Sequence, residues 1–153
     1  MSTAATGATV VATRPDPETR LHDTHHDALR LWLRLMTCSA MIERGIRRRL
    51  RERFGMALAR FDLLAQLERS SEGLRMGELS HRLMVSGGNV TGLVARLDAE
   101  GMVERTPEPG DRRASVVRLT ARGRDAVRAM AHEHERWIIE MTGGLCNADR
   151  TRL

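Results

Sequence analysis

The sequence contains no lysine and no tyrosine, and only two phenylalanines and two cysteines among its 153 residues. All 25 basic residues are therefore arginine, whose planar guanidinium pairs well with phosphate and with guanine. The scarcity of aromatic rings argues against a stacking platform for single-stranded nucleic acid. Cys38 and Cys146 are too few for a disulfide framework or a CxxC zinc site, so both are expected to be reduced thiols.

No apolar run approaches the length of a membrane-spanning helix, and the first residues lack the basic start and apolar core of a signal peptide. The protein is therefore expected in the cytoplasm, without a membrane partner. The sequence also lacks a Ser-His-Asp arrangement, a phosphate-binding loop and a dinucleotide fingerprint, which argues against an enzyme and against a bound cofactor. Its formal net charge of +5 and pI of about 10.9 favour a polyanionic partner instead.

The pattern of apolar residues divides the chain into an N-terminal arm and one mainly helical domain. Residues 1–20 are rich in Ala, Thr, Gly and Pro without periodicity and are expected to be disordered. A long helix is predicted over about 24–54, with Thr24 or the preceding Asp as its cap and Gly55 as its stop. The arginine run at 47–53 is interpreted as the solvated end of this helix, in preference to a nucleic-acid patch.

Residues 86–101, SGGNVTGLVARLDAEG, are the most informative stretch of the sequence. From Val90 onwards, apolar residues recur at i, i+3, i+4 and i+7, and the opposite side is small and polar apart from Arg96. A helix with an apolar back and a small polar front suits the major groove of DNA. Only Val85 and Ser86 separate it from a predicted helix at 77–84, and so tight a connection indicates a helix-turn-helix.

Shorter elements surround this pair of helices. They are, in chain order, a helix at about 58–69, a very short strand near 74–76, a strand at 102–105, a loop at 107–111 and a return strand at 114–119. Thr120 is predicted to cap a last long helix that runs to about residue 142. A hairpin directly after a helix-turn-helix makes a winged helix.

The whole arrangement resembles the MarR family of bacterial regulators over about residues 25–150. The most specific part is the hairpin, where the family pattern of D-x-R, a β-branched residue and L-T is matched by Asp111, Arg113, Val117, Leu119 and Thr120. Three further segments match the family's style in the correct order: FDLLAQL at 61–67, GELSHRL at 77–83 and NVTGLVARLDAEGMVER at 89–105.

The resemblance implies a mainly α fold with a small β-hairpin wing. A single domain over 21–153 would contain a winged helix at about 58–119, between dimerisation helices at 24–54 and 121–153. The implied partners are double-stranded DNA with a pseudo-palindromic operator and a second copy of the chain. The implied function is that of a dimeric repressor released by a small ligand, such as an aromatic acid or its thioester.

The residues expected to contact DNA lie at the start of the second helix of the pair and at the tip of the hairpin. Short hydrogen-bonding side chains and glycine N–H groups at a helix N-terminus suit phosphate, and a guanidinium suits guanine, phosphate or a narrow minor groove. The residues are Ser86, Gly87, Gly88, Asn89, Thr91, Arg96, Arg112 and Arg113. An ion pair between Arg113 and Asp111 that only stiffens the wing remains an alternative.

By the same resemblance, an effector would bind between the first, second and fifth helices. The candidate lining residues are Trp32, Met36, Arg60, Phe61, Leu64, His134 and Trp137. Arg60 would pair with a ligand carboxylate, although a surface ion pair with Asp62 or Glu68 is the favoured interpretation of this arginine. Ordinary core positions are likewise favoured for the apolar residues of the set.

Redox sensing and zinc sensing are two alternatives within the same fold. Cys38 lies more than a turn after Leu33, the position that the family's peroxide sensors would use, and the tyrosine partners are absent. His132 and His134 point to different faces of a helix and are a poor pair of metal ligands. Both modes are therefore disfavoured, and no metal site is expected.

Overall fold

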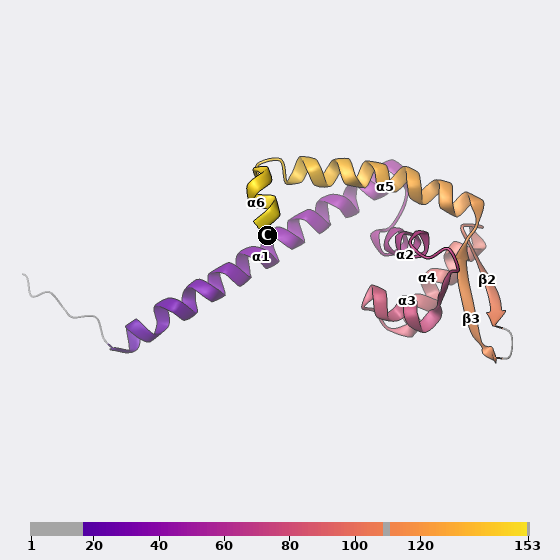
Figure 1. Ribbon diagram of the computed structural model, residues 1–153, viewed down its shortest axis with the longest axis horizontal. Coiled ribbons are helices and arrows are strands. Elements are labelled where there is room, and N and C mark those ends of the chain that lie inside the picture. The colour runs from indigo at the N-terminus through magenta and orange to yellow at the C-terminus, as the bar shows by residue number, and fades with distance from the viewer. Residues whose placement is uncertain (1–16, 109–110, 153) are drawn as a thin grey trace, which may run out of the picture. The chain divides into compact units, whose positions relative to one another are not determined.

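The computed structural model describes the backbone of residues 17–108 and 111–152, and side chains at 26–107, 114–149 and 151–152. It is mainly helical with one small antiparallel sheet, as the sequence predicts (Figure 1). The elements are α1 (Pro17–Phe54), α2 (Leu58–Glu68), β1 (Leu74–Arg75), α3 (Met76–Leu83), α4 (Gly87–Ala99), β2 (Val103–Glu108), β3 (Asp111–Leu119), α5 (Ala121–Met141) and α6 (Asn147–Arg152). The chain divides between residues 40 and 41 into two compact units, which are described separately. No helix in the described part is long and apolar enough to cross a bilayer.

The first unit contains the N-terminal part of α1, which begins at Pro17 and so starts before the predicted cap. Proline suits the first turn of a helix, and the following ETRLH contains no helix breaker, so the helix extends into the predicted arm. Residues 1–16 of that arm lie outside the described residues. The apolar side chains on this part of α1 are about half exposed: Leu29, Trp32, Leu33 and Met36 at 51, 55, 49 and 54%.

The second unit contains the winged helix, in which α2, α3 and α4 share one apolar core with the sheet. Leu64 of α2, Leu79 of α3 and Val94 of α4 have no exposed surface. The predicted apolar stripe of α4 is confirmed, because only Leu93 among its members is less than fully buried. Each such side chain contributes roughly 1.5–3 kcal/mol when buried. This burial fixes which side of α4 faces outwards.

The sheet has the strand order β1-β3-β2, with antiparallel pairing throughout. Both hairpin strands are longer than predicted, because β2 continues to Glu108 and β3 begins at Asp111. Pro107, Glu108 and Asp111 of the predicted loop at 107–111 therefore lie in the strands, and residues 109–110 lie outside the described part. Pro107 is tolerated within β2 because that strand is at the edge of the sheet and its pairing shifts after this residue.

The start of α5 is bonded to the chain that follows α4. The predicted cap is confirmed, since the hydroxyl of Thr120 accepts a hydrogen bond from the N–H of Gly123 at 3.0 Å. Gly123 lies against the backbone of Met102, the residue before β2. A Cβ placed at Gly123 would be 1.9 Å from the carbonyl oxygen of Met102. Only a residue without a side chain fits this position.

Arginines near the C-terminal end of α1 reach across to α5 within the second unit. The guanidinium of Arg49 lies 2.6 Å from a carboxylate oxygen of Glu140, and that of Arg53 lies 3.0 Å from Glu133. Glu133 is the one charged residue described as buried, and Arg136 also lies within 3.2 Å of it. Arg49 and Arg53 therefore join α1 to α5, and Arg53 stays exposed, as expected for the solvated end of a helix.

Candidate nucleic-acid interface

The start of α4 presents backbone N–H groups and short side chains to the outside. Ser86 occupies the predicted N-cap position, with φ −66° and ψ 151°, but its side chain makes no capping hydrogen bond. The N–H of Asn89 bonds instead to the carbonyl oxygen of Ser86 at 3.0 Å. Gly87, Gly88 and Asn89 are all exposed. The first turn of α4 therefore keeps the N–H groups of Gly87 and Gly88 and the serine hydroxyl at the surface, where an anion is favoured.

The outward side of α4 contains three glycines that no contact within the protein requires. A Cβ at Gly87, Gly88 or Gly92 would meet no atom within 4 Å. Glycine in a helix destabilises it by about 1 kcal/mol relative to alanine. The hydroxyl of Thr91 donates to the carbonyl oxygen of Gly87 at 3.0 Å, so this side chain projects little from the surface of the helix. Arg96 is the exposed cation of the face.

The turn between α3 and α4 is held by two hydrogen bonds between the same residues. The hydroxyl of Ser80 donates to the carbonyl oxygen of Val85 at 2.6 Å, and the N–H of Val85 donates to the carbonyl oxygen of Ser80 at 3.2 Å. Met84 closes the turn in the left-handed region, with φ 53°, and its side chain is 91% exposed. The helix predicted at 77–84 ends with Met84, whereas in the structure this residue is the C-cap that follows α3.

The wing is present as the hairpin of β2 and β3. The backbones of Arg112 and Arg113 lie in β3, and their side chains lie outside the described part of the chain. Nearer the sheet, Arg105 donates to the hydroxyl of Ser115 across the hairpin at 3.2 Å. The placement of the two tip arginines relative to α4 stays a prediction.

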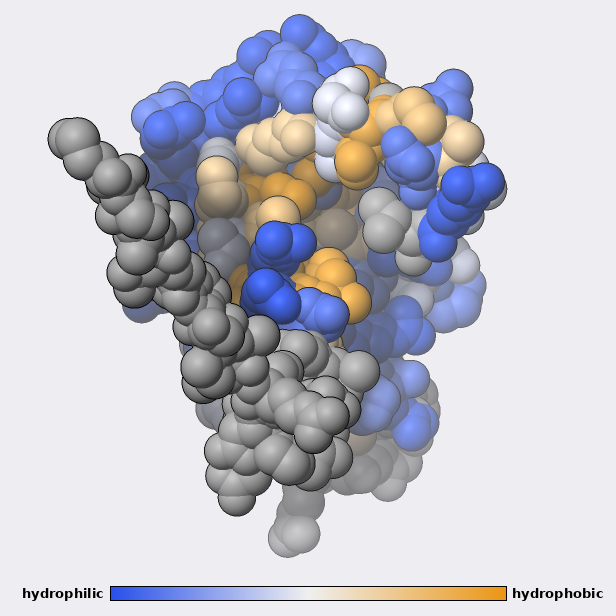
Figure 2. Space-filling model, turned by 90° about the vertical axis from the view of Figure 1, so that its left-hand side faces the viewer, coloured by the Kyte–Doolittle hydropathy of each residue, from blue (hydrophilic) through white to orange (hydrophobic). Residues whose placement is uncertain are grey.

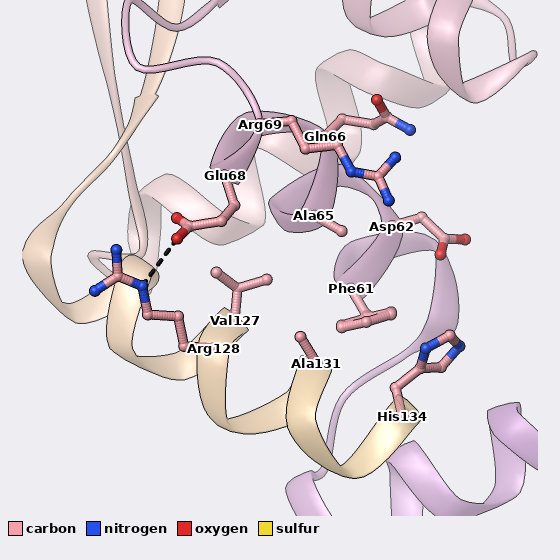
Figure 3. Close-up of a pocket in the computed structure, with 10 residues that line it drawn as sticks. All are labelled: Phe61, Asp62, Ala65, Gln66, Glu68, Arg69, Val127, Arg128, Ala131 and His134. Atoms are coloured by element: carbon pink, nitrogen blue, oxygen red, sulfur yellow. Dashed lines mark hydrogen bonds and ion pairs between the residues drawn. The ribbon is translucent and has the colours of Figure 1, made fainter. Parts of the chain in front are cut away.

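A cavity of about 330 Å³ lies between α2 and α5 (Figure 3). Its lining residues are Phe61, Asp62, Ala65, Gln66, Glu68, Arg69, Val127, Arg128, Ala131 and His134. Figure 3 shows Phe61 and His134 at one end, where their ring centroids are 5.2 Å apart, and the ion pair of Glu68 with Arg128 at the other, at 2.9 Å. An apolar floor with polar groups at both ends is typical of a small-molecule site.

Two of the seven predicted pocket residues, Phe61 and His134, line this cavity. Leu64 is fully buried core, and Trp137 lines a different cavity beside Arg49 and Arg53. Trp32 and Met36 belong to the first unit and are exposed there. Sequence reasoning missed the other polar lining residues, of which Arg128 lies on α5 and the rest lie on α2 or at its C-cap.

Arg60 does not line the cavity, because its guanidinium forms an ion pair with Glu100 at the end of α4. This partner differs from the Asp62 or Glu68 expected from the sequence. Glu68 pairs with Arg128 instead.

Burial changes the protonation of two cavity residues. Desolvation lowers the pKa of His134 below its ordinary value of 6.5, so the neutral imidazole is favoured. Desolvation, with a smaller contribution from the negative charge of Glu43, raises the pKa of Asp62 above 3.8. Within the described residues, no group of three or more His, Cys, Asp or Glu is placed to hold a metal ion. Cys38 and Cys146 are free and exposed.

We expect Asp62→Asn to raise the unfolding midpoint at pH 7. A raised pKa means that the folded protein holds the proton more tightly than the unfolded chain, so ionisation above pH 3.8 lowers stability and its removal restores it. The gain should vanish as the pH falls below that value. Thermal unfolding followed by circular dichroism from pH 3 to pH 8 measures this, with Asp98→Asn on the exposed side of α4 as control. A midpoint that drops at pH 7 would contradict the assignment.

Known proteins with a similar sequence or structure support the fold described above. A MarR family model matches residues 54–114. The transcriptional activatory protein BadR of Rhodopseudomonas palustris is 34% identical over 106 residues, which are 68% of this chain and 60% of BadR. This chain therefore spans less than two thirds of the length of that curated relative.

Two solved structures cover more of the chain. A MarR family transcriptional regulator from Silicibacter pomeroyi has 32% identity and a TM-score of 0.71, covering 85% of this chain and 89% of that one. Sco3205, a MarR family transcriptional regulator from Streptomyces coelicolor solved in complex with DNA, has 26% identity and a TM-score of 0.74, covering 80% of each chain. All of these proteins are named as transcription regulators, in agreement with the expectation of a regulator and not an enzyme. From the family model, the identity and the coverage, the chain belongs to the MarR family of transcriptional regulators.

Proposed function

We propose that this chain is a sequence-specific DNA-binding regulator that acts as a homodimer on a pseudo-palindromic operator. The observation that carries the proposal is the outward side of α4, where three glycines have open space around them. Glycines that cost a helix stability without any internal contact are explained by close approach of a partner. The exposed N–H groups of the first turn and the guanidinium of Arg96 supply the contacts to phosphate and base that DNA requires.

The DNA contacts that we assign are those expected from the sequence. Ser86, Gly87, Gly88 and Asn89 would hold phosphate at the start of α4, while Thr91 and Arg96 would face the major groove. Arg112 and Arg113 at the wing would reach the adjacent minor groove or backbone. Sco3205, solved with DNA, provides the fold-level analogy for this mode of docking.

Dimer formation is supported by the exposed apolar side chains of both units. In the first unit Leu29, Trp32, Leu33 and Met36 form one helical stripe. In the second unit Ile139 and Leu145 are 54% and 38% exposed. Figure 2 shows hydrophobic side chains gathered between hydrophilic ones on the face that it displays. Sedimentation velocity at micromolar concentration tests this proposal, and a purely monomeric species would overturn it.

We assign the cavity between α2 and α5 to a small effector, and we propose repression that the effector relieves. Its apolar floor and neutral His134 suit an aromatic ring, as in an aromatic acid or its thioester. The name of BadR describes an activator, so the direction of regulation needs its own test. Expression of a reporter gene fused to the operator, once the operator is identified by selection from a random DNA library, should rise when the regulator is deleted. A fall in expression would indicate activation.

We expect Gly92→Ala to stabilise the protein and to weaken its binding to DNA. Alanine should raise the free energy of unfolding by about 0.5–1 kcal/mol, because the added methyl group meets no atom within 4 Å and improves helix propensity. The same methyl group should separate α4 from the groove and reduce operator affinity by about tenfold. Urea unfolding and fluorescence anisotropy measure the two effects.

Gly77→Ala is the matched control, because Gly77 of α3 is also an exposed helical glycine with open space around it. It should give a similar stabilisation with unchanged affinity. If Gly92→Ala binds the operator as tightly as the wild type, then close approach does not explain the glycine.

Selection of bound sequences from a random DNA library tests the proposed function itself. The account expects enrichment of a two-fold symmetric sequence whose half-sites are centred about 10 base pairs, or one helical turn, apart. Recovery of unrelated sequences in proportion to the starting library would contradict it.

A further inference from the structure

The ion pair between Arg60 and Glu100 connects α2 with the C-terminal end of α4. The side chain of Arg60 is only 15% exposed, and that of Glu100 is 42% exposed. The Nε atom of Arg60 is buried without a hydrogen-bond partner among the described residues. A guanidinium enclosed to this extent is less screened by solvent than a surface arginine, so loss of its partner is felt more strongly.

Glu100 is not a peripheral residue of α4. It is the C-cap of the helix, and its N–H bonds to the carbonyl oxygen of Arg96 at 3.1 Å. The next two residues close the helix end: Gly101 takes φ +67°, and the N–H of Met102 bonds to the carbonyl oxygen of Leu97 at 2.9 Å. A displacement of the Glu100 side chain would therefore displace the whole C-terminal end of α4.

A second attachment joins the same helix end to α5. The hydroxyl of Thr120 donates to the carbonyl oxygen of Gly101 at 2.7 Å, and the N–H of Thr120 donates to the carbonyl oxygen of Met102 at 3.1 Å. Gly123 lies directly against Met102. The beginning of α5 is thus fixed to the two residues that follow Glu100.

The two helices that hold the end of α4 are the two walls of the cavity. The cavity is lined by α2 and its C-cap, from Phe61 to Arg69, and by α5 from Val127 to His134 (Figure 3). Any change in the spacing of these walls must move Arg60 relative to Thr120. Because the end of α4 is bonded to both, a change in the spacing of the walls would reach α4 through these contacts.

We propose that Arg60 and Glu100 are a positioning pair that sets the orientation of α4 and couples it to the cavity between α2 and α5. This inference rests on the proposed function, since α4 is taken as the DNA-contacting helix. The pair acts through α4 and touches neither DNA nor effector. The sequence alone does not indicate this role, because each residue is an ordinary charged residue there.

Hydrogen exchange of the amides at residues 97–102, measured without DNA, tests the positioning role directly. Arg60→Met keeps the apolar stem of the side chain and removes its charge, and Glu100→Gln keeps the shape of the carboxylate. We expect exchange at 97–102 to become about tenfold faster in each variant, since a tenfold change corresponds to about 1.4 kcal/mol of local opening. The charge-exchanged double variant Arg60→Glu, Glu100→Arg should restore slow exchange.

Arg47→Met is the matched control, because Arg47 pairs with Glu43 within α1 and neither residue lines the cavity. It should leave exchange at 97–102 unchanged. Unchanged exchange in Arg60→Met and Glu100→Gln would overturn the proposal. Operator affinity by fluorescence anisotropy is the second measurement, with about a tenfold loss expected in both single variants. If wild-type protein binds no DNA, the proposed function fails while the exchange result still decides the pair.

Filling the cavity tests the coupling without any identified ligand. Ala65 of α2 lines the cavity, and Ala65→Phe would place a ring in it as a covalent probe. We expect this variant to alter exchange at 97–102 by several-fold in the wild-type background and to have a clearly smaller effect in the Arg60→Met background, where only the attachment through Thr120 remains. Equal effects in the two backgrounds would show that the pair does not carry the coupling.

Discussion

Gly123→Ala should lower the stability of the winged helix by at least about 3 kcal/mol, in the range of severe overpacking. Alanine would normally favour a helix by about 1 kcal/mol over glycine. Here its methyl group would be 1.9 Å from the carbonyl oxygen of Met102 and 2.8 Å from the carbonyl carbon. The obstacle is backbone, which cannot rotate away like a side chain. Met102 also accepts a hydrogen bond from Thr120, so its displacement breaks a second contact.

Thermal and urea unfolding followed by circular dichroism measure this loss, which for a domain of this size corresponds to a fall of about 6–12 °C or more in midpoint. Gly144→Ala is the control, because a Cβ at Gly144 meets no atom within 4 Å. It should change the midpoint little. An unchanged or raised midpoint in Gly123→Ala would mean that α5 does not start against Met102 as described.

Arg96→Ala should produce the largest loss of DNA affinity among single truncations of α4. Arg96 is exposed, lies one turn beyond Gly92, and forms no ion pair with any described residue. Its guanidinium is therefore available for guanine or phosphate, a contact of about 1–3 kcal/mol, or roughly 5- to 150-fold in affinity. In a dimer the loss would occur in both half-sites.

Fluorescence anisotropy with the selected operator over a salt series measures the effect. Loss of a phosphate contact would also reduce the salt dependence of binding by about one counterion per half-site, whereas loss of a base contact would relax specificity at one position. Arg122→Ala on the exposed side of α5 is the control and should bind as the wild type does. Wild-type affinity and salt dependence in Arg96→Ala would remove this residue from the interface.

Local patterns in the sequence account for most of the fold. The stripe of α4 could be predicted because four apolar residues at helical spacing have one way to be buried. The cap at Thr120 could be predicted because a hydroxyl before a helix bonds an N–H within its own first turn. The hairpin strands were predicted too short, since proline and glycine indicate a loop whereas an edge strand accepts Pro107.

Contacts between distant residues could not be predicted in this way. Arg60 and Glu100 are 40 positions apart, and nearer carboxylates at Asp62 and Glu68 gave a simpler expectation. Trp137 was a candidate lining residue of the same site as Phe61, yet its ring lies 6.4 Å from that of Phe54, with the guanidinium of Arg49 5.9 Å away. The helical period places a residue on a side of its own helix, but the partner of that side depends on how the helices cross.

The central claim is that α4 recognises a DNA sequence. Its most direct test is the ratio of affinities of the wild-type protein for the selected operator and for a scrambled duplex of the same composition, both measured at about 150 mM salt. The account predicts a ratio of about 10³ or more, typical of specific recognition. Equal affinities for the two duplexes would contradict it.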